Sequence, residues 1–149
     1  MTKWLWLGLI VACAVLLGGC GGTSSDLGVG EGSGVVAADG FDPFGNQGGP
    51  MNLMYFTLPA SGTFELILST GPDQPALPNP WVMVFDGHVN ENNIDFLGAY
   101  NSGAGVLAEN HGANIASVIV TANAGDVFTY AFSSWTRGTG AYSWRVTQL

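Results

Sequence analysis

After residue 50, hydrophobic residues recur at every second position in short runs that end near proline or glycine. The period is clearest in four runs, at residues 53–58, 63–68, 128–132 and 142–147. In the last of these, Tyr142, Trp144 and Val146 share one parity, and the residues between them are polar. Such alternation between turn residues is typical of short antiparallel strands with one buried face.

Further strands are expected at residues 81–85, 94–100, 106–108 and 115–120. The first is apolar at both parities, which predicts a strand covered on both faces, and Asp86-Gly87 provides a turn after it. No segment shows a sustained helical period. Seven or eight short strands at turn-marked intervals predict an all-β fold, a single antiparallel β-sandwich of the jelly-roll kind.

The tryptophans and tyrosines divide into core and surface candidates. Tyr142 and Trp144 share the buried parity of the last strand, and Trp81 lies in the doubly apolar run. We therefore expect these three in the core. Trp135 lies in a polar loop, residues 134–138, and is the candidate exposed ring. Because exposed rings stack on sugar faces, Trp135 is a possible ligand contact.

The N-terminal pattern differs from the rest. Lys3 precedes an apolar run, residues 4–17, which is about as long as the hydrophobic region of a signal peptide. The following order, Leu17-Gly18-Gly19-Cys20, resembles the lipobox of bacterial lipoproteins. That resemblance implies a signal peptide at residues 1–19 and acyl chains, such as palmitate, on Cys20. The alternatives are an ordinary secretory signal or an uncleaved anchor.

Residues 20–40 are rich in glycine and serine, which predicts a flexible tether before a folded domain at residues 41–149. Twenty such residues have a root-mean-square reach of roughly 25 Å. The alternative is that part of this segment, residues 35–38, pairs as an edge strand.

Charge and cysteine content exclude several classes of function. Without the leader, the basic residues are Arg137 and Arg145, and against eleven carboxylates they leave a net charge of −9. Nucleic-acid binding and electrostatic adhesion to anionic lipid both need basic clusters, so neither is expected. Membrane contact is expected through lipid at Cys20 instead. Since Cys13 leaves with the leader, no thiol remains for a disulfide.

Four segments resemble, in order, parts of bacterial pre-peptidase C-terminal (PPC) domains: residues 55–66, 81–87, 124–130 and 140–146. These are small secreted β-sandwiches appended to extracellular proteases and collagenases. The resemblance implies a PPC-like sandwich over most of residues 51–149, with residues 89–102 as an insertion. Some members bind calcium through an Asp-rich segment, but the corresponding residues 107–114 contain only one carboxylate, Glu109.

Residues suited to catalysis or metal binding are scattered. The candidate calcium ligands are Asp86, Asp95 and Glu109, which converge with Glu91 only if their loops fold together. The sequence favours the alternative that these acids keep the surface soluble. His88 and His111 are both expected in loops, and no serine lies in a G-x-S-x-G motif. No catalytic residue and no cofactor are therefore predicted.

Together these features favour a non-catalytic lipoprotein of the bacterial cell envelope that presents a β-sandwich to an extracytoplasmic protein or glycan. Gly21, rather than aspartate, follows Cys20, which favours the outer membrane in a host with two membranes. Two alternatives stay open: a carbohydrate-binding module that uses Trp135, and a small envelope hydrolase that uses loop acids or His111.

Overall fold

The structure is a computed structural model that describes residues 29–45, 49–73, 75–102 and 105–149. The predicted lipobox at Leu17–Cys20 lies outside these residues. The described elements follow in chain order: β1 (Gly30–Val36), β2 (Asn52–Thr57), β3 (Gly62–Thr70), β4 (Pro80–Asp86), α1 (Asn93–Ser102), β5 (Val106–His111), β6 (Ile115–Ala122), β7 (Val127–Ser134) and β8 (Gly140–Gln148).

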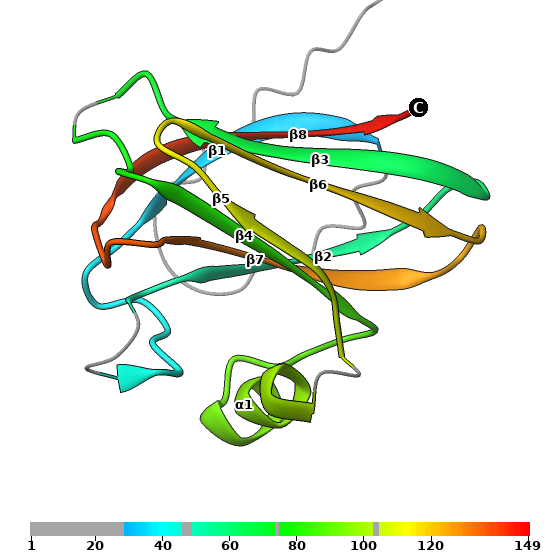
Figure 1. Cartoon of the computed structure of the whole chain (residues 1–149), viewed down its shortest axis with the longest axis horizontal. Helices are drawn as coiled ribbons and strands as arrows, with labels where there is room; N and C mark the ends of the chain where they lie inside the picture. Colours follow the sequence, from blue (N-terminus) through cyan, green and yellow to red (C-terminus); the bar gives the residue numbers. More distant parts are fainter. Residues whose placement is uncertain (1–28, 46–48, 74, 103–104) are drawn as a thin grey trace, which may run out of the picture.

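The strands form two antiparallel four-stranded sheets that face each other (Figure 1). Their orders are β1-β8-β3-β6 and β2-β7-β4-β5. This pairing of sheets is the jelly-roll arrangement, because each successive strand crosses to the opposite sheet until β4. The predicted single antiparallel β-sandwich of seven or eight strands is confirmed.

Alternation along the strands builds the core between the sheets. Phe64, Leu66 and Leu68 of β3 are buried, and they face Phe56 and Tyr130 of the opposite sheet. The predicted core positions Tyr142 and Trp144 belong to this cluster. The sandwich core therefore follows from the period-2 pattern.

A second apolar cluster covers the outer face of the β2-β7-β4-β5 sheet. Trp81, Met83 and Phe85 of β4 point into it, and α1 contributes the fully buried Phe96. Figure 1 shows α1 beneath this sheet. The predicted burial of residues 81–85 on both faces is thus confirmed, and α1 is its physical reason.

The expected strand at residues 94–100 is wrong, because the chain forms α1 there. Asn92 caps the helix by accepting a hydrogen bond from the Asp95 backbone N–H at 2.8 Å, and its side chain donates to the Asp95 carboxylate at 2.7 Å. This reciprocal pair stabilises the first turn. The buried Phe96 then packs on Phe85, with ring centroids 4.9 Å apart.

The expected flexible tether is also wrong for its second half. Gly30–Val36 form β1, which pairs with β8 along its whole length. A Cβ at Gly32 would lie 2.8 Å from the Trp144 ring, and one at Gly34 would lie 2.5 Å from the Tyr142 hydroxyl. Glycine is needed because these rings lie against the β1 backbone. The alternative, an edge strand at residues 35–38, correctly predicts a strand in this segment, but the observed strand begins earlier, at Gly30.

Strand directions give the sandwich two distinct ends. At the end that we call the entry end, Gly30 of β1 lies opposite Val146, and residues 58–61 and 123–126 form turns. The far end holds the turns at residues 112–114 and 135–139. None of the described helices is long and apolar enough to cross a membrane.

Candidate functional site

A cleft of about 380 Å³ opens at the far end, between the β7–β8 turn and the layer that covers β4. Four aromatic side chains line it, Phe44, Trp81, Tyr100 and Trp135. Gly49, Ser134 and Arg137 complete the lining. These residues come from segments far apart in the chain, so the cleft exists only in the folded domain.

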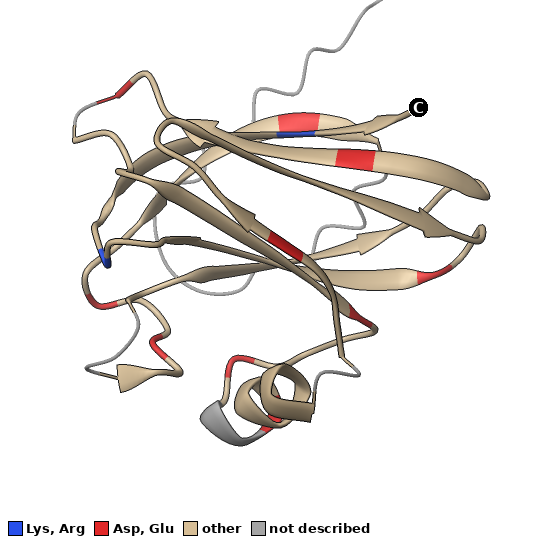
Figure 2. Cartoon of the chain, in the orientation of Figure 1, with Lys and Arg blue, Asp and Glu red and all other residues tan. Residues whose placement is uncertain are grey.

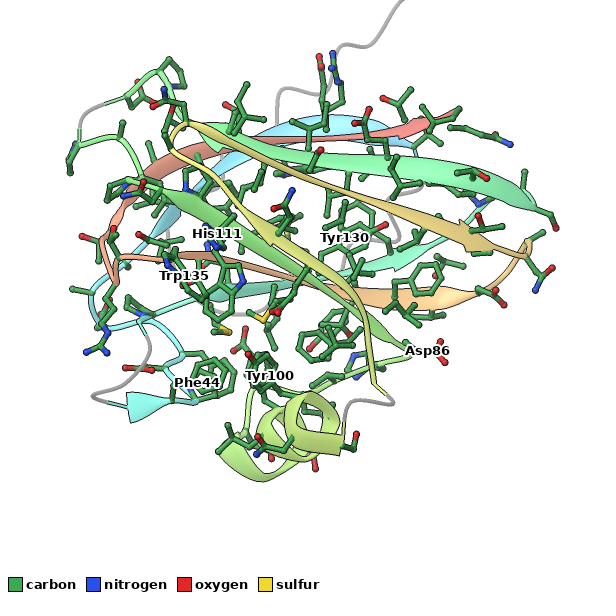
Figure 3. All side chains as sticks on the ribbon, viewed as in Figure 1. Phe44, Asp86, Tyr100, His111, Tyr130 and Trp135 are labelled. Atoms are coloured by element: carbon green, nitrogen blue, oxygen red, sulfur yellow. The ribbon has the colours of Figure 1, made fainter. Side chains whose placement is uncertain are left out.

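The aromatic rings form one continuous series, which we call the aromatic row: Tyr100, Phe44, Trp81, Trp135 and His111. Ring centroids are 5.1 Å apart for Tyr100 and Phe44, and 6.1 Å for Phe44 and Trp81. Trp81 meets Trp135 edge to face at 5.2 Å, and Trp135 stacks on His111 at 4.2 Å with nearly parallel planes. Figure 3 shows Trp135 beside His111, with Phe44 and Tyr100 below them.

Exposure varies along the row. Trp81 is only 7% exposed and anchors the row to the sheet. Trp135 is 53% exposed and is the one aromatic among the large exposed apolar side chains of the described chain. Its predicted exposure is confirmed, but it does not stand alone, since three further rings share the cleft. Beside the exposed Trp135, the half-buried rings of Phe44 and Tyr100 line the same cleft.

Hydrogen bonds fix the turn that carries Trp135. The Trp135 backbone N–H donates to the Asn79 carbonyl at 2.9 Å, and the Asn79 side chain donates to the Thr136 hydroxyl at 3.2 Å. The buried Ser134 hydroxyl donates to the Pro78 carbonyl at 2.5 Å. The backbone of this turn is therefore fixed, and the Trp135 ring itself packs against Trp81 and His111, which lowers the entropic cost of binding.

Backbone strain is concentrated at the same place. Asn79 (φ 45°) and Arg137 (φ 61°) are the two non-glycine residues with positive φ in the part of the chain that the structure describes. This conformation costs an L-residue roughly 1–2 kcal/mol. Gly49 lies against Arg137, where a Cβ would come within 2.8 Å of the Arg137 Cα. Strain held by surrounding packing is frequent at binding sites.

The cleft also differs from the rest of the surface in charge. Arg137 lines it, and none of the described residues that line it is a carboxylate. Arg145, the other described cation, lies on the outer face of β8 opposite Glu31. Figure 2 shows the two arginines far apart, and acidic residues on many segments of the chain. Nearby, partial burial raises the pKa of the Tyr100 hydroxyl, and the Glu109 carboxylate adds to this effect.

The structure does not bring the two histidines together. His111 ends β5 rather than lying in a loop, whereas His88 follows β4 at the opposite end and stacks on Tyr55 at 3.9 Å. The His111 imidazole contacts Trp135, and none of the described carboxylates is hydrogen-bonded to it.

The candidate calcium ligands are also separated. Asp86 ends β4 at the entry end, Asp95 lies in the first turn of α1, and Glu109 lies on β5 (Figure 3 labels Asp86). The Asn90 and Asn92 side chains both donate hydrogen bonds to Asp95 Oδ2, and these bonds lower the pKa of Asp95. No group of three His, Cys, Asp or Glu side chains within the described ranges could hold a metal ion. The structure therefore does not bring Asp86, Asp95 and Glu109 together at one site.

Comparison with known proteins gives structural likeness alone. No family model matches the sequence, and no curated protein is significantly similar to it. The structure is similar to the pre-peptidase C-terminal domain of a Bacillus anthracis collagenase, with TM-score 0.46, 12% identity, and coverage of 80% of this chain and 90% of that chain. It is also similar to PliG of Aeromonas hydrophila, a periplasmic inhibitor of g-type lysozyme, with TM-score 0.44, 12% identity, and coverage of 82% and 87%. Neither similarity indicates a ligand for this chain.

Proposed function

We propose that the protein is a non-catalytic binding module of the bacterial cell envelope, anchored by lipid at Cys20, and that its cleft holds a glycan. The observation that carries this proposal is the aromatic row, with Trp135 exposed at its surface and Trp81 buried beneath. Sugar rings present apolar C–H faces that pack on aromatic rings, while their hydroxyls stay hydrated.

The rigidity of the site supports binding rather than catalysis. The Trp135 turn is fixed by hydrogen bonds to the Pro78–Asn79 segment, so the rings need little reordering when a ligand binds. A hydrolase would need an acid and a base that converge on one bond. The cleft lining contains no carboxylate, and His111 lies behind the Trp135 ring.

The position of the cleft suits a protein held by its N-terminus. Nine residues separate Cys20 from Gly30, the first residue of β1. Fully extended, this stretch of chain spans at most about 35 Å. An anchor at Cys20 would keep the entry end near the membrane, while the cleft at the far end faces away from it. In a host with two membranes, we place the anchor in the outer one.

Affinity electrophoresis of the mature chain in gels that contain soluble polysaccharides tests the glycan proposal. We expect retardation by at least one polysaccharide, and at least a tenfold weaker affinity for Trp135→Ala. Ile119→Ala is the matched control, because Ile119 is 57% exposed on the other sheet. A protein that no polysaccharide retards, or equal affinity of Trp135→Ala and the unmodified chain, would contradict the proposal.

The anchor has its own test. Cys20→Ser removes the acceptor for acyl chains, so the protein is expected to leave the membrane fraction and lose incorporation of labelled palmitate. Two or more acyl chains bind stably to a membrane, whereas the acidic domain has no basic cluster to do so. Equal incorporation of labelled palmitate by Cys20→Ser and the unmodified chain would rule out lipid at this position.

A further inference from the structure

We infer that β1 is a docking edge for an extended basic segment of another protein, which adds to the sheet as a further strand and places a lysine or arginine in a hollow beside Val35. None of the residues that line this hollow also lines the aromatic cleft, so the inference does not depend on the proposed glycan site. It gives the domain a second binding surface.

The open side of β1 is the first observation. Among the described strands, β1 pairs with β8 alone, which makes it an edge of its sheet. The Asn52 side chain donates to the Val35 carbonyl at 2.9 Å, so the backbone of Val35 points away from β8. Since backbone groups alternate between the two sides of a strand, those of Glu31 and Ser33 point the same way. An added strand can therefore pair with Glu31 and Ser33 while β8 stays in place.

The sequence of β1 does not protect this edge. Edge strands are commonly blocked by lysine, proline or a bulge, which prevent pairing with another chain. β1 reads Gly-Glu-Gly-Ser-Gly-Val-Val, and its register with β8 is continuous. Its one charged residue, Glu31, lies opposite Arg145 near the entry end. The rest of the strand is thus an uncharged template for another extended segment.

A hollow of about 260 Å³ at the Val36 end of β1 is the second observation. Its walls are mostly apolar, and Val35, Pro75 and Ala141 are among them. Asp73 is the one charged residue among the described residues that line it. Val35 is 58% exposed, and a strand added to β1 would place a side chain beside it on the same face of the sheet. A long side chain at that position can enter the hollow.

The chemistry of the hollow selects a cationic side chain. Lysine and arginine have apolar stems and charged tips, so the stem can pack on the walls while the tip meets the Asp73 carboxylate. Neither described arginine lines the hollow. Two arginines against eleven carboxylates give the mature chain a net charge of −9, which attracts a basic segment at long range. Main-chain pairing then provides affinity, and the hollow provides specificity.

The test uses a phage-displayed library of random peptides of about ten residues, long enough to span β1, selected on the mature chain. We expect the selected peptides to share a lysine or arginine among β-forming residues. Their affinity is expected to fall about threefold or more in Asp73→Asn. Asp86→Asn is the matched control, because it makes the same change in charge at an exposed position at the end of β4, in the other sheet.

Amide exchange, followed by NMR, locates the bound peptide. Exchange of the Glu31 and Ser33 N–H groups should slow at least tenfold, whereas Gly32 and Gly34, which already face β8, should change little. Ser33→Pro removes a donor on the open side and should weaken binding about tenfold or more, and Ser33→Ala keeps the donor and should bind normally. If Ser33→Pro lowers the melting temperature, N-methylation of alternate peptide amides tests the same pairing: one alternate set should abolish binding and the other should not.

Several results would overturn the inference. They are a library that yields no binding peptide, selected peptides without enriched lysine or arginine, and binding that leaves the exchange of Glu31 and Ser33 unchanged. A dimer of the mature chain in analytical ultracentrifugation that Ser33→Pro abolishes would assign the edge to a second copy instead. The proposed function is tested separately, because polysaccharide binding is measured with Trp135→Ala.

Discussion

Two tyrosines in the sandwich core differ in what their hydroxyls contact. Tyr142 accepts a hydrogen bond from the Asn52 side chain at 3.0 Å, whereas the buried Tyr130 hydroxyl has no partner among the described residues. A buried polar group without a partner costs about 1–3 kcal/mol. Tyr130→Phe is therefore expected to raise the free energy of unfolding by about 1 kcal/mol, and Tyr142→Phe to lower it by a similar amount, as measured by urea denaturation.

The same hydroxyl makes stability depend on alkaline pH. Burial raises the pKa of Tyr130 from 10.0 to about 12, so the folded protein keeps its proton while the unfolded chain loses it. Stability from this group is present below pH 10 and is lost as the pH rises from 10 to 12, by on the order of 2 kcal/mol. Urea titrations at pH 9 and 11.5 should show a smaller loss in Tyr130→Phe. An equal loss in both proteins would indicate that Tyr130 titrates normally.

Some residues of the candidate site can be predicted from the sequence, and others cannot. Trp135 was identifiable because a tryptophan in a short polar loop cannot reach the core. Phe44 and Tyr100 were not linked to it, since only long-range packing places them on the same row. Arg137 has a positive φ and lies against Gly49, 88 positions earlier in the chain, and no local sequence pattern predicts this contact.

At the scale of elements, the glycine-rich strand β1 gives a matched series of substitutions. Gly30, Gly32 and Gly34 point to the same face, but a Cβ at Gly30 would meet nothing within 4 Å. Gly32→Ala and Gly34→Ala are expected to destabilise the domain by about 1–3 kcal/mol each, because the methyl group would displace Trp144 or Tyr142. Gly30→Ala should be close to neutral in the same urea titrations. Three equal effects would mean that β1 does not lie against these rings.

The alternate glycines of β1 are visible in the sequence, but their glycine content predicts a flexible tether rather than a strand. Glycines at every second position look flexible when they are considered alone. Their meaning depends on Tyr142 and Trp144, which have the same period in β8 and pair with Gly34 and Gly32. The sequence also fails to predict helix α1. The helix is short, and the feature that marks its start is the pair of Asn92–Asp95 hydrogen bonds rather than a long helical period of apolar residues.

At the scale of the whole molecule, the two four-stranded sheets confirm the β-sandwich that alternation predicted, because strands with one apolar face enclose a core when two sheets pack on each other. What alternation does not specify is the cover on the outer face of the β2-β7-β4-β5 sheet. That cover, made by α1 and residues 41–44, forms one wall of the cleft. The candidate site therefore arises where the fold departs from a plain two-layer sandwich.

The boundary of the folded unit can be tested with two deletions of equal length. Removal of residues 30–36 takes away β1 and exposes Trp144 and Tyr142, so we expect loss of cooperative thermal unfolding. Removal of residues 22–28 shortens the segment before β1 and breaks no described contact, so the melting temperature should stay within about 2 °C. Both variants keep Cys20, and differential scanning calorimetry of the mature chains compares them directly. Because glycan binding depends on the far end of the sandwich, the second variant should also retain the affinity of the unmodified chain. If instead both deletions leave cooperative unfolding intact, β1 is dispensable and the domain begins near residue 41, as its glycine content alone suggested.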